Sequence, residues 1–175
     1  MIENALEIRH ITKTFGPVVA NRDVTMDIRK GEILSVLGEN GSGKTTLMNM
    51  ISGIYKPDRG QIFVDGKEVS IDSPEDSKRL GIGMVHQHFM LVPSLTVAEN
   101  MVLGAEPRKG RLFFDYKKAV CLTREISEKY NLPINPEKRI MDISVGYKQR
   151  VEILKILLRG AKILSVGTYY RLFIP

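Results

Sequence analysis

The sequence predicts an α/β protein in which short strands and helices alternate before a mostly helical segment. The first observation is a nearly continuous apolar run at residues 32–37, typical of a buried strand, which leads directly into a glycine-rich segment. The second is a helical pattern that follows the glycines and ends near Gly53. The third is a change between residues 89 and 142, where strand signals become rare and helical spacing takes over.

Further strands and helices are expected on both sides of the glycine-rich segment. Alternation of apolar and polar residues predicts strands at residues 6–12, 24–28 and 61–64. Short apolar runs predict buried strands at residues 82–85 and 163–166. Ser73-Pro74 resembles an N-cap followed by a first-turn proline, and an Asp65-Gly66 pair predicts a hairpin turn. Helices are expected at residues 74–80, 97–103, 115–130 and 144–160, the last with Gly160 as its C-cap.

The composition excludes several classes of protein. A chain of 175 residues with 43% hydrophobic residues suits one packed domain and not a disordered chain. The net charge of +6 comes from scattered basic residues without interleaved aromatics, so nucleic-acid binding is not expected. Cys121 stands alone, excludes an internal disulfide, and is expected on the core side of a helix. Neither a signal peptide nor an apolar span of about 20 residues is visible, so we expect a cytosolic chain, or one attached to a membrane through a partner.

Residues 38–45 match the pattern G-x-x-x-x-G-K-[ST] of a phosphate-binding loop. Glycines allow the backbone to wrap around phosphates, and the following helix presents its positive end to them. Lys44 is expected to reach the β- and γ-phosphates, and the Thr45 hydroxyl to bind Mg²⁺. A chance match in such a chain occurs on the order of once in a few hundred sequences. The candidate phosphate-binding residues are Gly38, Glu39, Asn40, Gly41, Ser42, Gly43, Lys44, Thr45 and Thr46.

Four further features, spread over residues 5–164, resemble the nucleotide-binding domain of ABC transporters. They are Phe15 upstream of the loop, Gln87 after a buried strand, the helical segment behind it, and Ser144-Val145-Gly146 at the start of a helix. The resemblance implies a P-loop NTPase core with an antiparallel β subdomain and an inserted α-helical subdomain. It also implies ATP and Mg²⁺ as cofactors.

The resemblance assigns a role to each matching residue. Phe15 stands where the family stacks an aromatic ring on adenine, although it could be an ordinary core aromatic. Gln87 is the catalytic glutamine that senses Mg²⁺ and the attacking water. Ser144, Val145 and Gly146 match the signature motif, which holds the γ-phosphate of ATP bound to another domain. His10 and the histidines beside Gln87 are expected to be structural.

Two departures and one closer likeness refine this picture. Val145 replaces the first glycine of the motif Leu-Ser-Gly-Gly-Gln, and Tyr147 replaces its glutamine. Residues 83–93 and 95–100 look like the ATPases of simple-sugar and nucleoside importers. That likeness implies a permease in the membrane, a second ATPase domain in tandem or as a dimer, and indirectly a solute-binding protein. It places the chain on the cytoplasmic face of the membrane.

The family pattern stops after residue 164, where an apolar stretch ending in Asp-Glu-Pro-Thr is expected. The chain instead continues from Ser165 to Pro175 without a carboxylate, and the last acidic residue is Glu152. The chain is therefore interpreted as one incomplete domain: a core at residues 1–88, a helical subdomain at 89–142, a signature helix and strand at 143–164, and an aberrant tail at 165–175. A frameshift near Ser165 or a genuinely truncated variant would explain the tail.

These features leave three hypotheses open. The chain is the ATPase of an importer, a soluble ABC ATPase without a transport role, or a remnant that does not catalyse. Because the aspartate that holds Mg²⁺ and the glutamate that activates water are absent, little hydrolysis is expected. Apolar faces left by missing strands are expected to make the isolated chain poorly stable.

Overall fold

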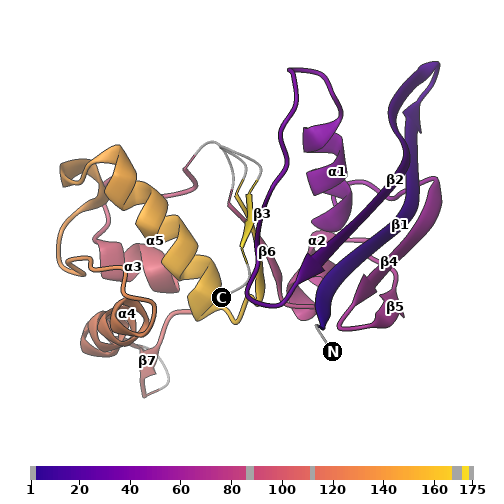
Figure 1. Ribbon diagram of the computed structural model, residues 1–175. Helices are drawn as coiled ribbons and strands as arrows, with labels where there is room; N and C mark the ends of the chain where they lie inside the picture. Colours follow the sequence, from indigo (N-terminus) through magenta and orange to yellow (C-terminus); the bar gives the residue numbers. More distant parts are fainter. Residues whose placement is uncertain (1–2, 86–88, 111–112, 167–170, 174–175) are drawn as a thin grey trace. The chain divides into compact units, whose positions relative to one another are not determined.

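The computed structural model describes residues 3–85, 89–110, 113–166 and 171–173. It divides into two compact units. The first consists of Met1–Gln87 with Ala161–Pro175, and the second consists of His88–Gly160. Figure 1 shows the elements of each unit, coloured along the sequence. The second unit takes in the helical segment predicted at residues 89–142 and also the helix predicted at residues 144–160, which the sequence assigns to a separate part of the domain.

An antiparallel sheet forms one layer of the first unit, with strand order β2-β1-β4-β5 (Figure 1). Its strands are β1 (Asn4–Phe15), β2 (Val18–Arg29), β4 (Arg59–Val64) and β5 (Lys67–Val69). The first two are longer than the sequence predicts, because a two-residue turn at Gly16 and Pro17 lets their ends continue the ladder up to the pair Phe15–Val18. The predicted Asp65-Gly66 turn is confirmed: both residues have positive φ and join β4 to β5.

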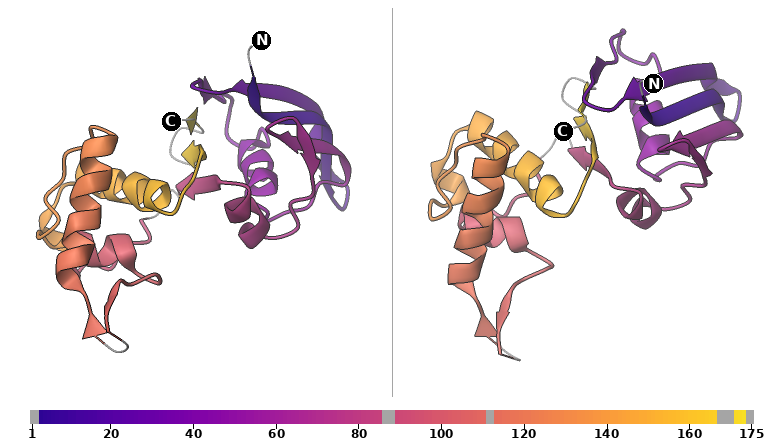
Figure 2. Two further views of the ribbon diagram at one scale, coloured as in Figure 1. Left: turned by 90° about the horizontal axis from the view of Figure 1, so that it is seen from below. Right: turned by 60° about the horizontal axis from the view of Figure 1, so that its bottom comes forward.

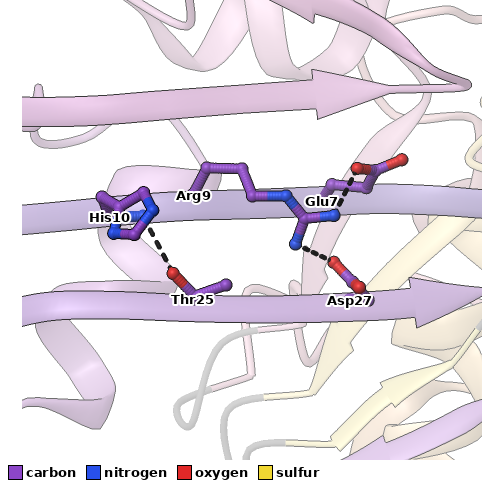
Figure 3. Close-up of polar contacts among 5 residues, drawn as sticks. All are labelled: Glu7, Arg9, His10, Thr25 and Asp27. Atoms are coloured by element: carbon purple, nitrogen blue, oxygen red, sulfur yellow. Dashed lines mark hydrogen bonds and ion pairs between the residues drawn. The ribbon is translucent and has the colours of Figure 1, made fainter.

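An irregularity in β1 lies between Ile8 and Ile11, where the pairing with β2 shifts register. His10 has φ +54° there, and its main-chain N–H donates to Thr25 Oγ1 at 3.1 Å (Figure 3). Arg9 beside it pairs with Asp27 on β2 and with Glu7 on its own strand (Figure 3). These contacts fasten β1 to β2 across the bulge.

A second sheet has the strand order β3-β10-β9-β6. Its members are β3 (Ile33–Ser35), β10 (Arg171–Phe173), β9 (Ile163–Val166) and β6 (Ile82–Val85). Strands β6 and β9 are parallel and were predicted as buried runs, and β3 lies within the predicted run at residues 32–37. The sequence does not predict β10. This strand lies antiparallel between β3 and β9, so a piece of the expected aberrant tail is part of the sheet.

Two helices accompany these sheets, and α1 lies between them (Figure 2). They are α1 (Lys44–Ile51) and α2 (Pro74–Arg79). Helix α1 contributes four buried side chains to the core of this unit, Leu47, Met48, Met50 and Ile51. Ser73 caps α2 as predicted, because its hydroxyl accepts from the N–H of Asp76.

The described residues of the second unit form three α-helices around an apolar core of their own. They are α3 (Val97–Val102), α4 (Tyr116–Lys129) and α5 (Val145–Leu158), with a short 3₁₀ helix η1 (Ile140–Asp142) before the last. A small hairpin of β7 (Arg108–Lys109) and β8 (Phe113–Phe114) lies where the sequence indicates only a polar connection. The predicted helix ends hold within a residue or two. Gly160, with φ +86°, follows the actual C-cap Arg159.

The prediction for Cys121 is wrong. Its thiol is exposed and lies 3.2 Å from Glu125 Oε1 on the outer side of α4. The buried face of that helix carries Ala119, Val120 and Thr123. Cysteine is commonly buried, but the phase of the helix decides its side here.

Candidate functional site

The glycine-rich loop joins β3 to the first turn of α1, as the sequence predicts (Figure 1). Gly43 is the N-cap of α1 and has φ +85°, and Gly41 has φ +84°. A Cβ atom on Gly43 would lie 2.1 Å from the carbonyl oxygen of Ala20. The base of the loop is therefore packed directly on β2, at a backbone conformation and distance that require glycine.

The ammonium group of Lys44 occupies the centre of this loop. Its Nζ donates to the carbonyl oxygens of Gly38 at 2.8 Å and Glu39 at 2.6 Å, and to Ser42 Oγ at 3.0 Å. Ser42 N in turn donates to Glu39 O at 3.2 Å and closes the loop. The arrangement places the ammonium group of Lys44 next to the N-terminus of α1, whose first turn contains no acidic residue. Both features favour an anion at this position.

A hollow of about 270 Å³ lies at this point. It is lined by Val18, Val19, Ala20, Asn40, Gly41, Ser42, Gly43, Lys44, Thr45 and Thr46. Seven of the nine predicted phosphate-binding residues therefore share one surface, and the other two, Gly38 and Glu39, bind the Lys44 ammonium through their carbonyl groups. The sequence did not predict that Val18, Val19 and Ala20 of β2 line this hollow, because three small apolar residues carry no signal that distinguishes them from those of any other strand.

The exposed side chain of Thr45 lines the same hollow and offers a hydroxyl oxygen. Such an oxygen fits Mg²⁺, which usually takes one or two protein ligands and fills its shell with phosphate oxygens and water. Among the described residues, no group of three or more His, Cys, Asp or Glu side chains could hold a metal ion. Gln87, the predicted catalytic and metal-binding glutamine, lies outside the described residues.

Phe15 lies at the end of β1, one turn away from the hollow. It pairs across the hairpin with Val18, which lines the hollow itself. The ring is 43% exposed, so the alternative interpretation of Phe15 as a core aromatic is wrong. An exposed ring at this place leaves its predicted role in stacking a base open.

The predicted signature residues lie in the second unit, at the start of α5. Ser144 is the N-cap of this helix, yet its hydroxyl makes no capping hydrogen bond. Val145 and Gly146 are exposed, and no atom lies within 4 Å of a Cβ placed on Gly146. Tyr147 is 44% exposed, with the guanidinium of Arg150 4.7 Å from its ring centroid. The first turn of α5 is thus an accessible helix N-terminus without an acidic residue.

The family model described as ABC transporter matches residues 21–166. The chain belongs to the ABC transporter family. This membership confirms the resemblance that the sequence indicates, and the P-loop core with its antiparallel sheet confirms the predicted fold class.

Relatives within the ABC transporter family include import proteins. The chain is 53% identical over 164 residues to the guanosine import ATP-binding protein NupO of Bacillus subtilis and 52% identical over 162 residues to the nucleoside import ATP-binding protein NupA of Lactococcus lactis. It is 43% identical over 162 residues to the ribose import ATP-binding protein RbsA 1 of Streptomyces avermitilis. These matches cover 93% of the chain and 31 to 32% of each relative. The chain thus spans about a third of the length of the curated relatives it matches.

Solved ABC structures share the fold. The ADP conformation of the ATP-binding cassette MJ1267 superposes with a TM-score of 0.79 at 26% identity, covering 94% of this chain and 68% of that one. The protein cbiO1 of Clostridium perfringens, part of the complex cbiONQ, gives a TM-score of 0.76 at 25% identity over 94% and 65% of the two chains.

Proposed function

We propose that the chain binds ATP with Mg²⁺ at the loop between β3 and α1. The observation that carries this proposal is the Lys44 ammonium, held inside a ring of loop oxygens at the N-terminus of α1. An incoming triphosphate replaces these acceptors with phosphate oxygens, which bind an ammonium more strongly because they are charged. Thr45 supplies the protein oxygen for Mg²⁺. That a relative in fold, MJ1267, was solved in an ADP conformation supports the same ligand class.

We further propose that the start of α5 from a second ABC domain completes each ATP site, by contacting the γ-phosphate of the ATP bound to this chain. Ser144, Val145 and Gly146 are exposed there, and their first turn lacks an acidic side chain that would compete with an anion. The second domain would be in tandem or a separate copy. Val145 has a side chain where the motif has glycine. The substitution keeps the main-chain N–H group, which is the group that binds an anion at a helix N-terminus.

We propose import of a nucleoside or simple sugar as the process that this ATP site serves. The names of NupO, NupA and RbsA 1 support it, since each is an import ATP-binding protein at 43 to 53% identity. A permease would then be the membrane partner, with a solute-binding protein acting through that permease. None of the helices in the described residues combines the length and apolar character that crossing a bilayer requires. In this proposal the permease attaches the chain to the cytoplasmic face of the membrane.

Hydrolysis by a polypeptide of these 175 residues is expected to be slow. Gly167 and Thr168 directly follow β9, and no Asp or Glu occurs after Glu152. The family places an acid for Mg²⁺ and an acid for the attacking water behind this strand. Loss of a general base typically costs about 10² to 10⁴ in rate.

Titration with a fluorescent ATP analogue tests the binding site. Lys44→Ala should weaken binding about 10- to 100-fold, because a hydrogen bond to a charged group is worth about 1.5–3 kcal/mol. Lys67→Ala, which removes an exposed lysine on β5, is the matched control and should bind like the parent chain. Equal affinity of the Lys44→Ala variant and the parent would refute a working phosphate loop. A steady release of phosphate that Lys44→Ala abolishes would refute slow hydrolysis.

A further inference from the structure

An exposed aromatic pair joins the end of β1 to the segment that follows α1. Phe15 at the end of β1 and Tyr55 behind α1 meet edge to face, with ring centroids 5.2 Å apart and an interplanar angle of 72°. Both residues are exposed to solvent, Phe15 to 43% and Tyr55 to 37%. Aromatic rings in solvent normally adopt many rotamers, and an edge contact of this kind restricts them.

Tyr55 belongs to the segment that leaves the same helix whose first turn holds the phosphate loop. The N–H groups of Ile54 and Tyr55 both donate to Asn49 O of α1, at 2.8 and 3.1 Å. The tyrosine is therefore tied to the last turn of α1, while Lys44 and Thr45 belong to the first. Helix α1 thus links the phosphate loop to the aromatic pair through a rigid element.

Asp58 fastens the same segment to the end of β1. Its N–H donates to Thr12 O at 2.9 Å. Its carboxylate accepts from Thr14 N at 2.7 Å, from Thr14 Oγ1 at 2.8 Å and from Lys13 Nζ at 2.8 Å. These hydrogen bonds lower the pKa of Asp58 to about 2, so the carboxylate is ionised at neutral pH. The three residues before Phe15 are therefore fixed from the side on which Tyr55 lies.

We infer that Tyr55 and Asp58 are positioning residues for the nucleobase, acting through Phe15. Asp58 holds the backbone that carries Phe15, and Tyr55 limits the orientation of its ring. Lys13 Nζ lies 5.6 Å from the Phe15 ring centroid and adds a second restraint on it. A ring held in this way receives a planar base without first losing rotamer entropy. The inference rests on the proposed ATP site and assigns these residues to the base and not to the phosphates.

A comparison of ATP with inorganic tripolyphosphate tests this assignment. Both ligands engage the phosphate loop, but only ATP carries a base, so the ratio of their dissociation constants isolates the base contribution. Stacking of a base on an aromatic ring typically strengthens binding by about fivefold or more. Tyr55→Leu should weaken ATP binding about fivefold and leave tripolyphosphate binding within about twofold. Tyr55→Phe keeps the ring edge and should retain the parent ratio.

Two further variants separate positioning from general stability. Asp58→Asn loses the ion pair with Lys13. It should also weaken ATP binding relative to tripolyphosphate binding, by about threefold. Phe114→Leu is the matched control, since Phe114 forms a similar edge contact with Tyr116 in the other unit, at 6.3 Å and 70°. This control should leave both constants unchanged. Circular dichroism checks that every variant is folded, and Asp58→Asn serves as the test if Tyr55→Leu does not fold.

The outcomes distinguish this inference from the proposed function. If the parent chain binds both ligands and Lys44→Ala weakens both, the ATP site stands. The inference alone is overturned if Tyr55→Leu or Asp58→Asn then changes the dissociation constants of both ligands by the same factor, or changes neither. If the parent chain binds neither ligand, the proposed function is wrong and the inference falls with it.

Discussion

Replacing Gly43 by alanine would show how tightly the phosphate loop is packed on β2. The new Cβ would lie 2.1 Å from Ala20 O and 2.9 Å from Asn21 Nδ2. Both distances are shorter than 3.0 Å, the closest approach that Cβ atoms in proteins normally show. The φ of +85° adds about 1–2 kcal/mol for a left-handed alanine. Forced displacement of packed atoms typically costs about 1–3 kcal/mol more. The free energy of unfolding should therefore fall by about 2–5 kcal/mol, a large part of a typical domain's 5–15 kcal/mol.

Gly41→Ala provides the matched control within the same loop. Gly41 has almost the same φ, +84°, but no atom lies within 4 Å of its added Cβ. It therefore carries the backbone cost without the clash. Urea unfolding followed by circular dichroism should place Gly43→Ala about 1–3 kcal/mol below Gly41→Ala. Equal stability of the two variants would refute the claim that contact with β2 requires glycine at position 43.

Two buried polar side chains and one exposed carboxylate give further expected outcomes. Glu152→Ala removes the acceptor of the Met90 N–H, at 2.7 Å, and should cost about 1–3 kcal/mol in urea unfolding, whereas Glu152→Gln keeps an acceptor and costs less. Asn100→Asp keeps the acceptor for Val92 N but loses the amide donor to Val92 O, so the free energy of unfolding should fall by about 2–3 kcal/mol. The folded pKa of Asp58 is lowered from 3.8 to about 2, so its contribution to stability is present above about pH 4 and is lost as pH falls through 2; thermal melts of the parent and Asp58→Asn should converge there.

Each of these outcomes has a clear opposite. Equal stability of Glu152→Ala and Glu152→Gln would show that water replaces the lost acceptor. An Asn100→Asp variant as stable as the parent would mean that the amide donor is not needed. A melting difference between the parent chain and Asp58→Asn that persists unchanged at pH 2 would contradict the lowered pKa.

The phosphate loop could be predicted from the sequence because its chemistry needs particular residue types in one continuous segment. The buried strands β6 and β9 were visible for a similar reason, since a strand covered on both faces becomes an unbroken apolar run. Strand β10 has no such signal. Its three residues become a strand by pairing with β9, which ends at Val166, and with β3, which lies more than a hundred residues earlier in the sequence. Local propensity does not encode such a partner.

The rest of the candidate site was hidden for a related reason. Ala20 contacts the loop only because the β1–β2 hairpin folds back along it, and Tyr55 meets Phe15 only because α1 ends beside β1. Sequence spacing gives neither approach. Phe15 itself was found through a family resemblance and not through periodicity, which does not distinguish an exposed ring from a core ring.

The position of β10 has a consequence for the order in which the chain folds. Leu34 of β3 pairs with Leu172 of β10, and within the described residues this is the ladder that connects β3 to its sheet. During synthesis the strand that leads into the phosphate loop emerges early and waits for a partner made more than a hundred residues later. Contacts of such long sequence separation form slowly. Until then β3 is an unpaired edge, open to association with other chains, so the ATP site is expected to be among the last parts to assemble.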